Sequence, residues 1–308
     1  MRQGAAGTGP GTEMTTTSPL EAVLKRDRAI VIGGLVGVIV LAWIYILLGA
    51  GMGMTAIEMT AISDASGDMQ AVDRENGDGT GTAEGGTTSA TVSMAMAVMQ
   101  PAAWSAGYAV LMVFMWWIMM VAMMLPSAAP MILLYAAVNR KARERGAPFV
   151  PTGVFALGYL AAWGVFSLLA VALQWGLERT ALLSSMMVGT SIVLGGLLLI
   201  AAGAWQLTPL KHACLKHCRS PLHFLSHHWR KGRWGAFRMG AEHGAFCLGC
   251  CWFLMGLLFY GGVMNLYWIV GLAAFVLLEK TAPAGHWIGS AAGVGLIAWG
   301  GLLLLGSL

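Results

Sequence analysis

The chain gathers its candidate metal ligands in one short segment. All five cysteines and six of the seven histidines of this 308-residue sequence fall between Lys211 and Cys251. They form two groups, of which the first is His212, Cys214, His217 and Cys218 and the second is His243, Cys247, Cys250 and Cys251. Thiolates and imidazoles bind soft and borderline metal ions, so the segment predicts a site for Cu(I) or Zn(II).

The second group is spaced so that its members share one face of a helix. A helix turns by about 100° per residue, so the three cysteines project within roughly 80° of His243. His243 and Cys250 are nevertheless separated by about 10 Å along the helix axis. A second segment must therefore contribute ligands if several of these side chains bind one ion.

The first group is the nearest source of such ligands. If the stretch between Pro209 and Pro221 forms a short helix, Cys214 and Cys218 become an i, i+4 pair on one face. We expect this loop to fold back onto the helix of the second group and complete the site. Both groups are predicted at the cytoplasmic end of their membrane spans.

Methionines form a further candidate feature, on the second apolar segment. One helical stripe consists of Met112, Met115, Met119 and Met123, and a neighbouring stripe consists of Met120, Met124 and Met131. Thioethers are soft ligands that favour Cu(I), so the stripes predict a copper path, whereas the alternative is flexible packing. Pro126 and Pro130 are expected to bend this helix.

The elements that carry these side chains are predicted to be membrane helices. Apolar residues make up 57% of the chain and charged residues only 10%, which is typical of a polytopic membrane protein. The fold class is therefore all-α, with about seven transmembrane helices. The predicted spans are 29–49, 105–125, 150–175, 181–204, 242–261, 264–279 and 286–306.

The basic residues predict the orientation of these helices. With the N-terminus in the cytoplasm, sixteen of the eighteen Lys and Arg residues face the cytoplasm, and only Arg74 and Arg179 face outward. The net charge of +4 thus reports membrane topology, and we expect the lipid bilayer rather than nucleic acid as a partner.

The chain divides into four predicted regions. Residues 1–28 form a disordered cytoplasmic N-terminus, 29–49 a membrane anchor, 50–103 an acidic outer loop that is also disordered, and 104–308 a six-helix metal-binding domain. The outer loop carries seven methionines and seven carboxylates. It either concentrates copper outside the membrane or is a solvated linker.

Five motifs resemble a known family. They are similar to segments of the predicted metal-binding integral membrane proteins of bacteria, and the resemblance covers 104–306. The motifs are Met115–Pro130, Trp205–Pro221, Arg238–Trp252, Gly261–Asn265 and Leu278–Lys280. The resemblance implies copper handling in the bacterial inner membrane, including supply of copper to enzymes such as tyrosinases. The resemblance assigns copper binding to the methionine stripe of the second apolar segment and to six Cys and His residues, namely Cys214, Cys218, His243, Cys247, Cys250 and Cys251.

These observations predict a copper-handling membrane protein, a Cu(I) chaperone or carrier that is not an enzyme. Its partner would be a copper enzyme or a soluble copper chaperone. Two other hypotheses stay open. One is a membrane thiol–disulfide oxidoreductase that uses Cys247 and Cys250, with Cys214 and Cys218 as a second pair, although a reducing cytoplasm disfavours it. The other is a structural zinc site, which would leave the methionines without a role.

Overall fold

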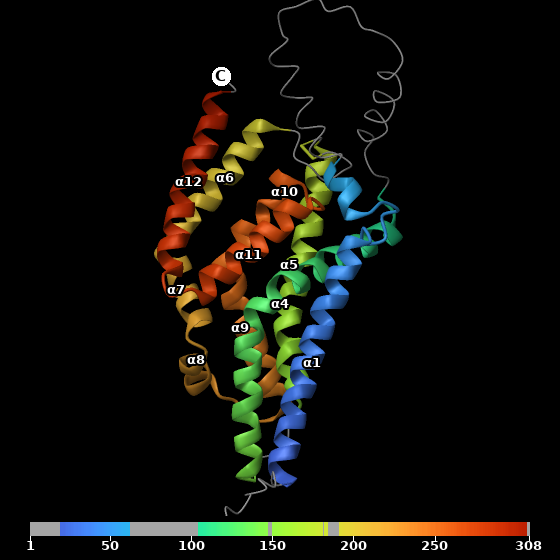
Figure 1. Cartoon of the computed structure of the whole chain (residues 1–308). Coiled ribbons are helices and arrows are strands. Elements are labelled where there is room, and N and C mark those ends of the chain that lie inside the picture. The colour runs from blue at the N-terminus through green and yellow to red at the C-terminus, as the bar shows by residue number, and fades with distance from the viewer. Residues whose placement is uncertain (1–18, 62–103, 147–149, 181, 184–190, 307–308) are drawn as a thin grey trace, which may run out of the picture.

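The computed structural model describes residues 19–61, 104–146, 150–180, 182–183 and 191–306, and within these ranges the protein is all-helical (Figure 1). The regions predicted to be disordered are 1–28 and 50–103, of which 1–18 and 62–103 lie outside the described residues, whereas 19–28 form the start of a helix. The helices are α1 (Pro19–Leu47), α4 (Ala106–Glu144), α5 (Thr152–Arg179), α6 (Ile192–Gln206), α7 (Pro209–Arg219), α8 (Pro221–His228), α9 (Gly232–Gly256), α10 (Leu258–Gly261), α11 (Leu266–Thr281) and α12 (Gly285–Leu305).

Five of the described helical segments are long and apolar enough to cross a membrane, which is fewer than the seven predicted. These segments are Arg28–Leu47, Ala106–Glu144, Thr152–Arg179, Gly232–Gly261 and Gly285–Leu305. A sixth results if α6 and α7, which are bent by 64° against each other, count as one broken span. The predicted span 264–279 corresponds to α11, whose 16 residues reach about 24 Å against a hydrocarbon core of about 30 Å.

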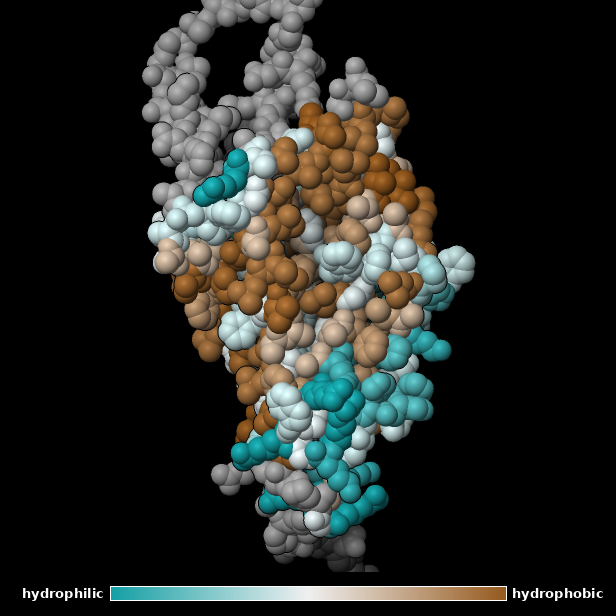
Figure 2. All heavy atoms as spheres, turned by 180° about the vertical axis from the view of Figure 1, so that it is seen from behind, coloured by the Kyte–Doolittle hydropathy of each residue, from teal (hydrophilic) through white to brown (hydrophobic). Residues whose placement is uncertain are grey.

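Apolar side chains dominate the surface of the helical body toward one end. In Figure 2, hydrophobic residues cover much of the upper part of the visible face, and hydrophilic residues gather toward its lower end. Exposed apolar side chains of this kind are expected where lipid replaces water as the solvent.

Helix α4 is bent near its middle and buries most of its methionines. Figure 1 shows the change of direction, and the helix contains Pro126 and Pro130 in its interior. A proline removes one backbone donor and clashes with the preceding turn, which kinks the helix. Helices α1, α5 and α11 pack against α4.

Helices α5 and α9 approach each other through glycines. A Cβ atom added to Gly240 would lie 1.9 Å from the carbonyl oxygen of Phe155, and one added to Gly158 would lie 2.0 Å from that of Phe237. Only glycine allows the two backbones to come this close. The same contact holds α5 beside the cysteines of α9.

This contact predicts a large effect of a small substitution. Gly240→Ala is expected to force α5 and α9 apart and to lower the free energy of unfolding by about 1–3 kcal/mol or more. Thermal unfolding of the detergent-solubilised protein measures the change. Gly176→Ala is the control, because no atom lies within 4 Å of its added Cβ, and equal melting temperatures for the two variants would contradict the prediction.

Candidate metal centre

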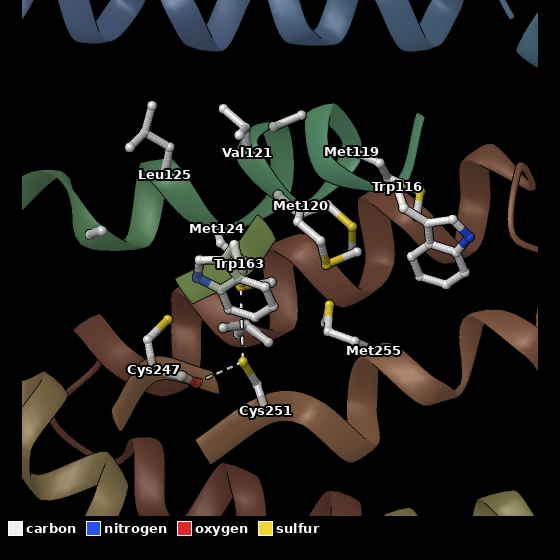
Figure 3. Packing of buried hydrophobic residues seen from close by; sticks show 14 of the residues in the cluster. Trp116, Met119, Met120, Val121, Met124, Leu125, Trp163, Cys247, Cys251 and Met255 are labelled. Carbon is white, nitrogen blue, oxygen red and sulfur yellow. Dashed lines mark hydrogen bonds between the residues drawn. The ribbon is translucent and has the colours of Figure 1, made fainter. Parts of the chain in front are cut away.

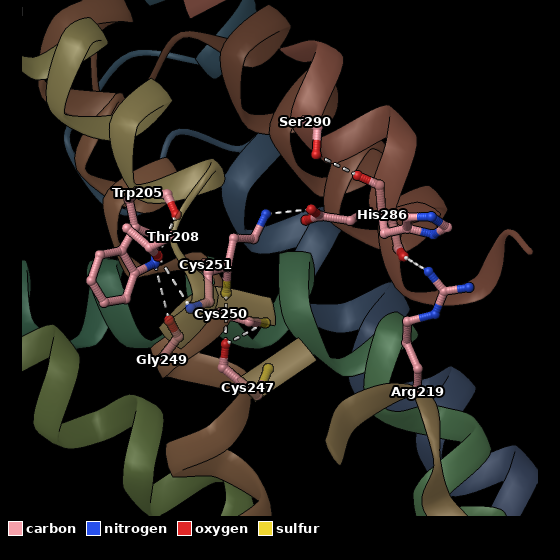
Figure 4. A network of polar contacts seen from close by, with 11 residues as sticks. Trp205, Thr208, Arg219, Cys247, Gly249, Cys250, Cys251, His286 and Ser290 are labelled. Carbon is pink, nitrogen blue, oxygen red and sulfur yellow. Dashed lines mark hydrogen bonds and ion pairs between the residues drawn. The ribbon is translucent and has the colours of Figure 1, made fainter. Parts of the chain in front are cut away.

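Helix α7 folds back onto α9, as the sequence predicted. Its N-cap Thr208 accepts a hydrogen bond from the backbone nitrogen of Lys211, and Pro209 follows at the first helical position. The preceding helix is tied to α9, since the Trp205 indole donates to the carbonyl oxygen of Gly249 at 3.2 Å (Figure 4). The side chain of Cys214 packs against Gly249. A Cβ atom added to this glycine would lie 2.9 Å from the sulfur of Cys214.

The cysteines of the two groups converge in the interior. Cys218 of α7 lies near Cys247 and Cys250 of α9. The thiols of Cys250 and Cys251 both donate to the carbonyl oxygen of Cys247, each at 3.0 Å. The three cysteines of α9 are no more than 1% exposed. We call Cys218, Cys247, Cys250 and Cys251 the thiol cluster.

The thiol cluster lies deeper along its helix than predicted. Helix α9 begins at Gly232, whereas the predicted span begins at residue 242. Cys247 is therefore about 22 Å along the helix axis from its start. The helix starts ten residues before the predicted span, because the polar segment before residue 242 continues the helix rather than forming a loop. The position of the cysteines at the cytoplasmic end of a membrane span stays a prediction.

The thiol cluster meets the methionines of α4. The sulfur of Cys251 lies 3.9 Å from that of Met124 (Figure 3), and Met120 and Met255 lie nearby in the same view. Met124 belongs to the second of the two predicted stripes. The four methionines proposed as ligands, Met112, Met115, Met119 and Met123, are likewise no more than 1% exposed.

A lysine and a tyrosine to which the sequence assigned no role at the metal site complete the surroundings of Cys247. The ammonium of Lys280 donates to the sulfur of Cys247 at 2.9 Å and to the hydroxyl of Ser127 at 3.2 Å. The hydroxyl of Tyr159 lies 3.1 Å from the same sulfur and donates to the carbonyl oxygen of Met124 at 3.2 Å. Lys280 is 9% exposed and thus places a buried positive charge on the cluster.

Glu279 and Lys280 are adjacent on α11 but have separate partners. Glu279 forms a buried ion pair with Lys211 of α7, and Lys280 turns toward Cys247. Adjacent residues on a helix point about 100° apart, and this geometry already indicates separate partners. The Lys211 pair fastens α7 to α11 and so supports the placement of Cys218.

His243 lies one turn before Cys247 on the same buried face, as predicted. Its ring packs between Phe155 and Tyr159 of α5 and Phe224 of α8. The histidine is 3% exposed, and its Nδ1 atom is buried without a hydrogen-bond partner. An unpartnered ring nitrogen beside a cysteine is chemically suited to bind a metal ion.

Glu242, the residue before this histidine, pairs with two arginines. Its carboxylate accepts hydrogen bonds from Arg230 at 2.9 Å and from Arg238 at 3.2 Å. Adjacent positions on α9 again point in different directions.

The two remaining predicted histidine ligands lie away from the thiol cluster. His217 stacks on Phe246 with ring centroids 4.2 Å apart, and its Nδ1 contacts the carbonyl oxygen of Ala213. His212 lines a separate pocket of about 580 Å³ together with His286. The thiol cluster therefore retains only His243 among the predicted histidine ligands.

The exposed histidines of α8 form a group of their own. His223 and His227 stack with centroids 4.1 Å apart. The positive charge of protonated His227, more than any other cause, lowers the pKa of His223 below its ordinary value. These histidines repel one another when protonated, and they lie on the exposed side of α8.

The thiols and thioethers of this region fit Cu(I) better than Zn(II), which requires several charged ligands in a fixed geometry. Among the described residues, no group of three or more His, Cys, Asp or Glu side chains is already arranged to hold a metal ion. Thiolates and thioethers are the donors that select Cu(I), and both kinds are present in the contact between Cys251 and Met124. A structural zinc site closes with four ligands in a tetrahedral arrangement.

Together, the described residues define an all-helical protein with several helices apolar enough to cross a membrane and a buried sulfur-rich cluster between them. A copper chaperone family, PpoB2, matches residues 113–303, which is more than half of the chain. The chain belongs to this family. No curated protein and no solved structure shows significant similarity to it.

Proposed function

We propose that this protein is an integral membrane Cu(I) chaperone or carrier. The thiol cluster holds the ion, and the methionines of α4 pass it between the two ends of the helical body by ligand exchange. Family membership supports copper handling, and the position of each ligand in this scheme is our inference.

One observation carries this proposal, namely the direct contact between the thiol cluster and the methionines. Cys251 and Met124 bring a thiol and a thioether to 3.9 Å inside the protein. A Cu(I) ion bound by the cysteines would need only a small displacement to acquire the sulfur of Met124 as its next ligand. A structural zinc site would gain nothing from a neighbouring thioether, because thioethers are poor ligands of Zn(II).

The proposed orientation places the N-terminus in the cytoplasm of a bacterium and the protein in its inner membrane. The strong bias of Lys and Arg toward one side of the predicted spans supports this orientation. A reducing cytoplasm also keeps the five free cysteines available as ligands. The recipient would be a copper enzyme, such as a tyrosinase, or a soluble copper chaperone.

A transfer experiment tests the role of the methionines. The purified protein is reconstituted into lipid vesicles that contain a chromophoric Cu(I) chelator, and the rate of colour formation after addition of Cu(I) is measured. Met120→Leu/Met124→Leu is expected to slow transfer by about tenfold or more, equivalent to ~1.4 kcal/mol in the barrier. Leucine keeps the packing volume but removes the sulfur.

Met264→Leu is the matched control, because Met264 is also buried but lies in the turn before α11. It should transfer copper at the wild-type rate. If the double variant transfers copper as fast as this control, the methionines of α4 act only in packing.

A further inference from the structure

A second buried polar network lies at the opposite end of α5 from the thiol cluster. The Trp116 indole donates to the amide oxygen of Gln174 at 2.8 Å, and the amide nitrogen of Gln174 donates to Glu178 at 2.9 Å. The other carboxylate oxygen of Glu178 accepts from the indole of Trp104 at 2.7 Å. Gln174 is 0% and Glu178 6% exposed.

The carboxylate of Glu178 has neutral hydrogen-bond donors but no cationic partner. Within the described part of the chain, no Lys, Arg or His forms an ion pair with it. The neighbouring Arg179 points elsewhere, since its guanidinium lies over the ring of Trp175, 4.8 Å from the centroid. A buried carboxylate without a counter-charge is unfavourable, so this position favours a bound cation.

Gln174 connects this carboxylate to a thioether sulfur. The amide nitrogen of Gln174, which bonds to Glu178, also lies 3.7 Å from the sulfur of Met112. Met115 follows one turn along α4 and is equally buried. Thioethers are neutral, so a Cu(I) ion held by them keeps its positive charge, and a nearby carboxylate compensates for it.

We propose that Met112 and Glu178 form a second Cu(I) site, separate from the thiol cluster. Met112 supplies a sulfur ligand and Glu178 supplies the counter-charge. The separation is large, because Tyr159 at the thiol cluster and Gln174 are about 22 Å apart along α5. This inference rests on the proposal that copper is the cargo.

The two ends are matched in charge to their ligands. Thiolates make a Cu(I) complex negative, and there the buried residue is Lys280, which donates to Cys247. Thioethers leave the complex positive, and there the buried residue is Glu178. The charge of the bound Cu(I) complex is therefore neutralised at both sites, by Lys280 at the thiol cluster and by Glu178 at Met112.

The test uses the full chain with Cys247→Ser/Cys250→Ser, so that the thiol cluster does not mask the second site. Cu(I) is titrated under reducing conditions in competition with a chromophoric chelator. We expect a residual Cu(I) site whose affinity falls about tenfold or more, or ~1.4 kcal/mol, when either Glu178→Gln or Met112→Leu is added. Glu144→Gln removes the same charge at the exposed end of α4 and should have no effect.

The outcomes separate this site from the thiol cluster. If the thiol variant binds no Cu(I), or if its residual affinity is the same with Glu178→Gln and with Glu144→Gln, the second site does not exist. If the wild-type chain and the thiol variant bind the same amount of Cu(I), and Glu178→Gln abolishes that binding, the second site stands while the thiol cluster fails. Melting temperatures of all variants identify any that do not fold, and Met112→Leu tests the site independently of Glu178.

Discussion

Replacing Cys247 and Cys250 together by serine is expected to lower the Cu(I) affinity of the thiol cluster at least about a thousandfold, which corresponds to ~4 kcal/mol. Both side chains are buried and lie near Cys218. Serine offers a hard oxygen in place of a soft sulfur at nearly the same volume, so the loss reports ligand chemistry rather than packing. Competition titration with a chromophoric Cu(I) chelator under reducing conditions measures the affinity.

Cys214→Ser is the matched control for this loss. Cys214 is partly exposed and packs at Gly249 beside the cluster. Its substitution should lower the affinity by less than about tenfold. Equal losses for Cys214→Ser and for the double variant would show that the site is centred on α7 rather than on α9.

Removing the charge of Lys280 is expected to have the second largest effect. Lys280→Met should weaken Cu(I) binding by about tenfold or more, ~1.4 kcal/mol. A Cu(I) ion with a pair of thiolates carries one net negative charge, which the buried ammonium compensates. The ammonium can keep its 2.9 Å hydrogen bond to Cys247, because a thiolate sulfur has further lone pairs for the metal.

The same charge should distinguish copper from zinc. A divalent ion with the same pair of thiolates is already neutral, so Lys280→Met should weaken Cu(I) binding while it favours Zn(II). Parallel titrations with the two ions measure the ratio of affinities, and Lys216→Met, at an exposed position of α7, is the control. A rise in Cu(I) affinity on loss of Lys280 would mean that the ammonium competes with the metal for Cys247.

The convergence of α7 and α9 could be predicted from the sequence because both groups follow helical spacing. Proline at each border of α7 sets its limits, and Cys218 then faces α9 as expected. Lys280 could not be assigned in this way, since its contact with Cys247 joins helices that are far apart in sequence. Only tertiary packing brings α11 next to the cluster.

The methionines illustrate the same limit. Helical periodicity separates two stripes on α4, but it does not show which stripe faces the cysteines. The bend near Pro126 and the packing of α5 turn Met124 toward Cys251. The count of about seven spans is not confirmed among the described residues, because α11 has only 16 residues, as its predicted span did, and α6 is bent against α7.

The most direct test of the central claim is X-ray absorption spectroscopy at the copper edge on protein loaded with Cu(I) under reducing conditions. We predict a first shell that is dominated by thiolate sulfur, and loss of this thiolate contribution in Cys247→Ser/Cys250→Ser, where the second site would leave only thioether sulfur. A first shell of oxygen and nitrogen alone, or a sulfur shell that persists unchanged in the double variant, would contradict a copper site at the thiol cluster.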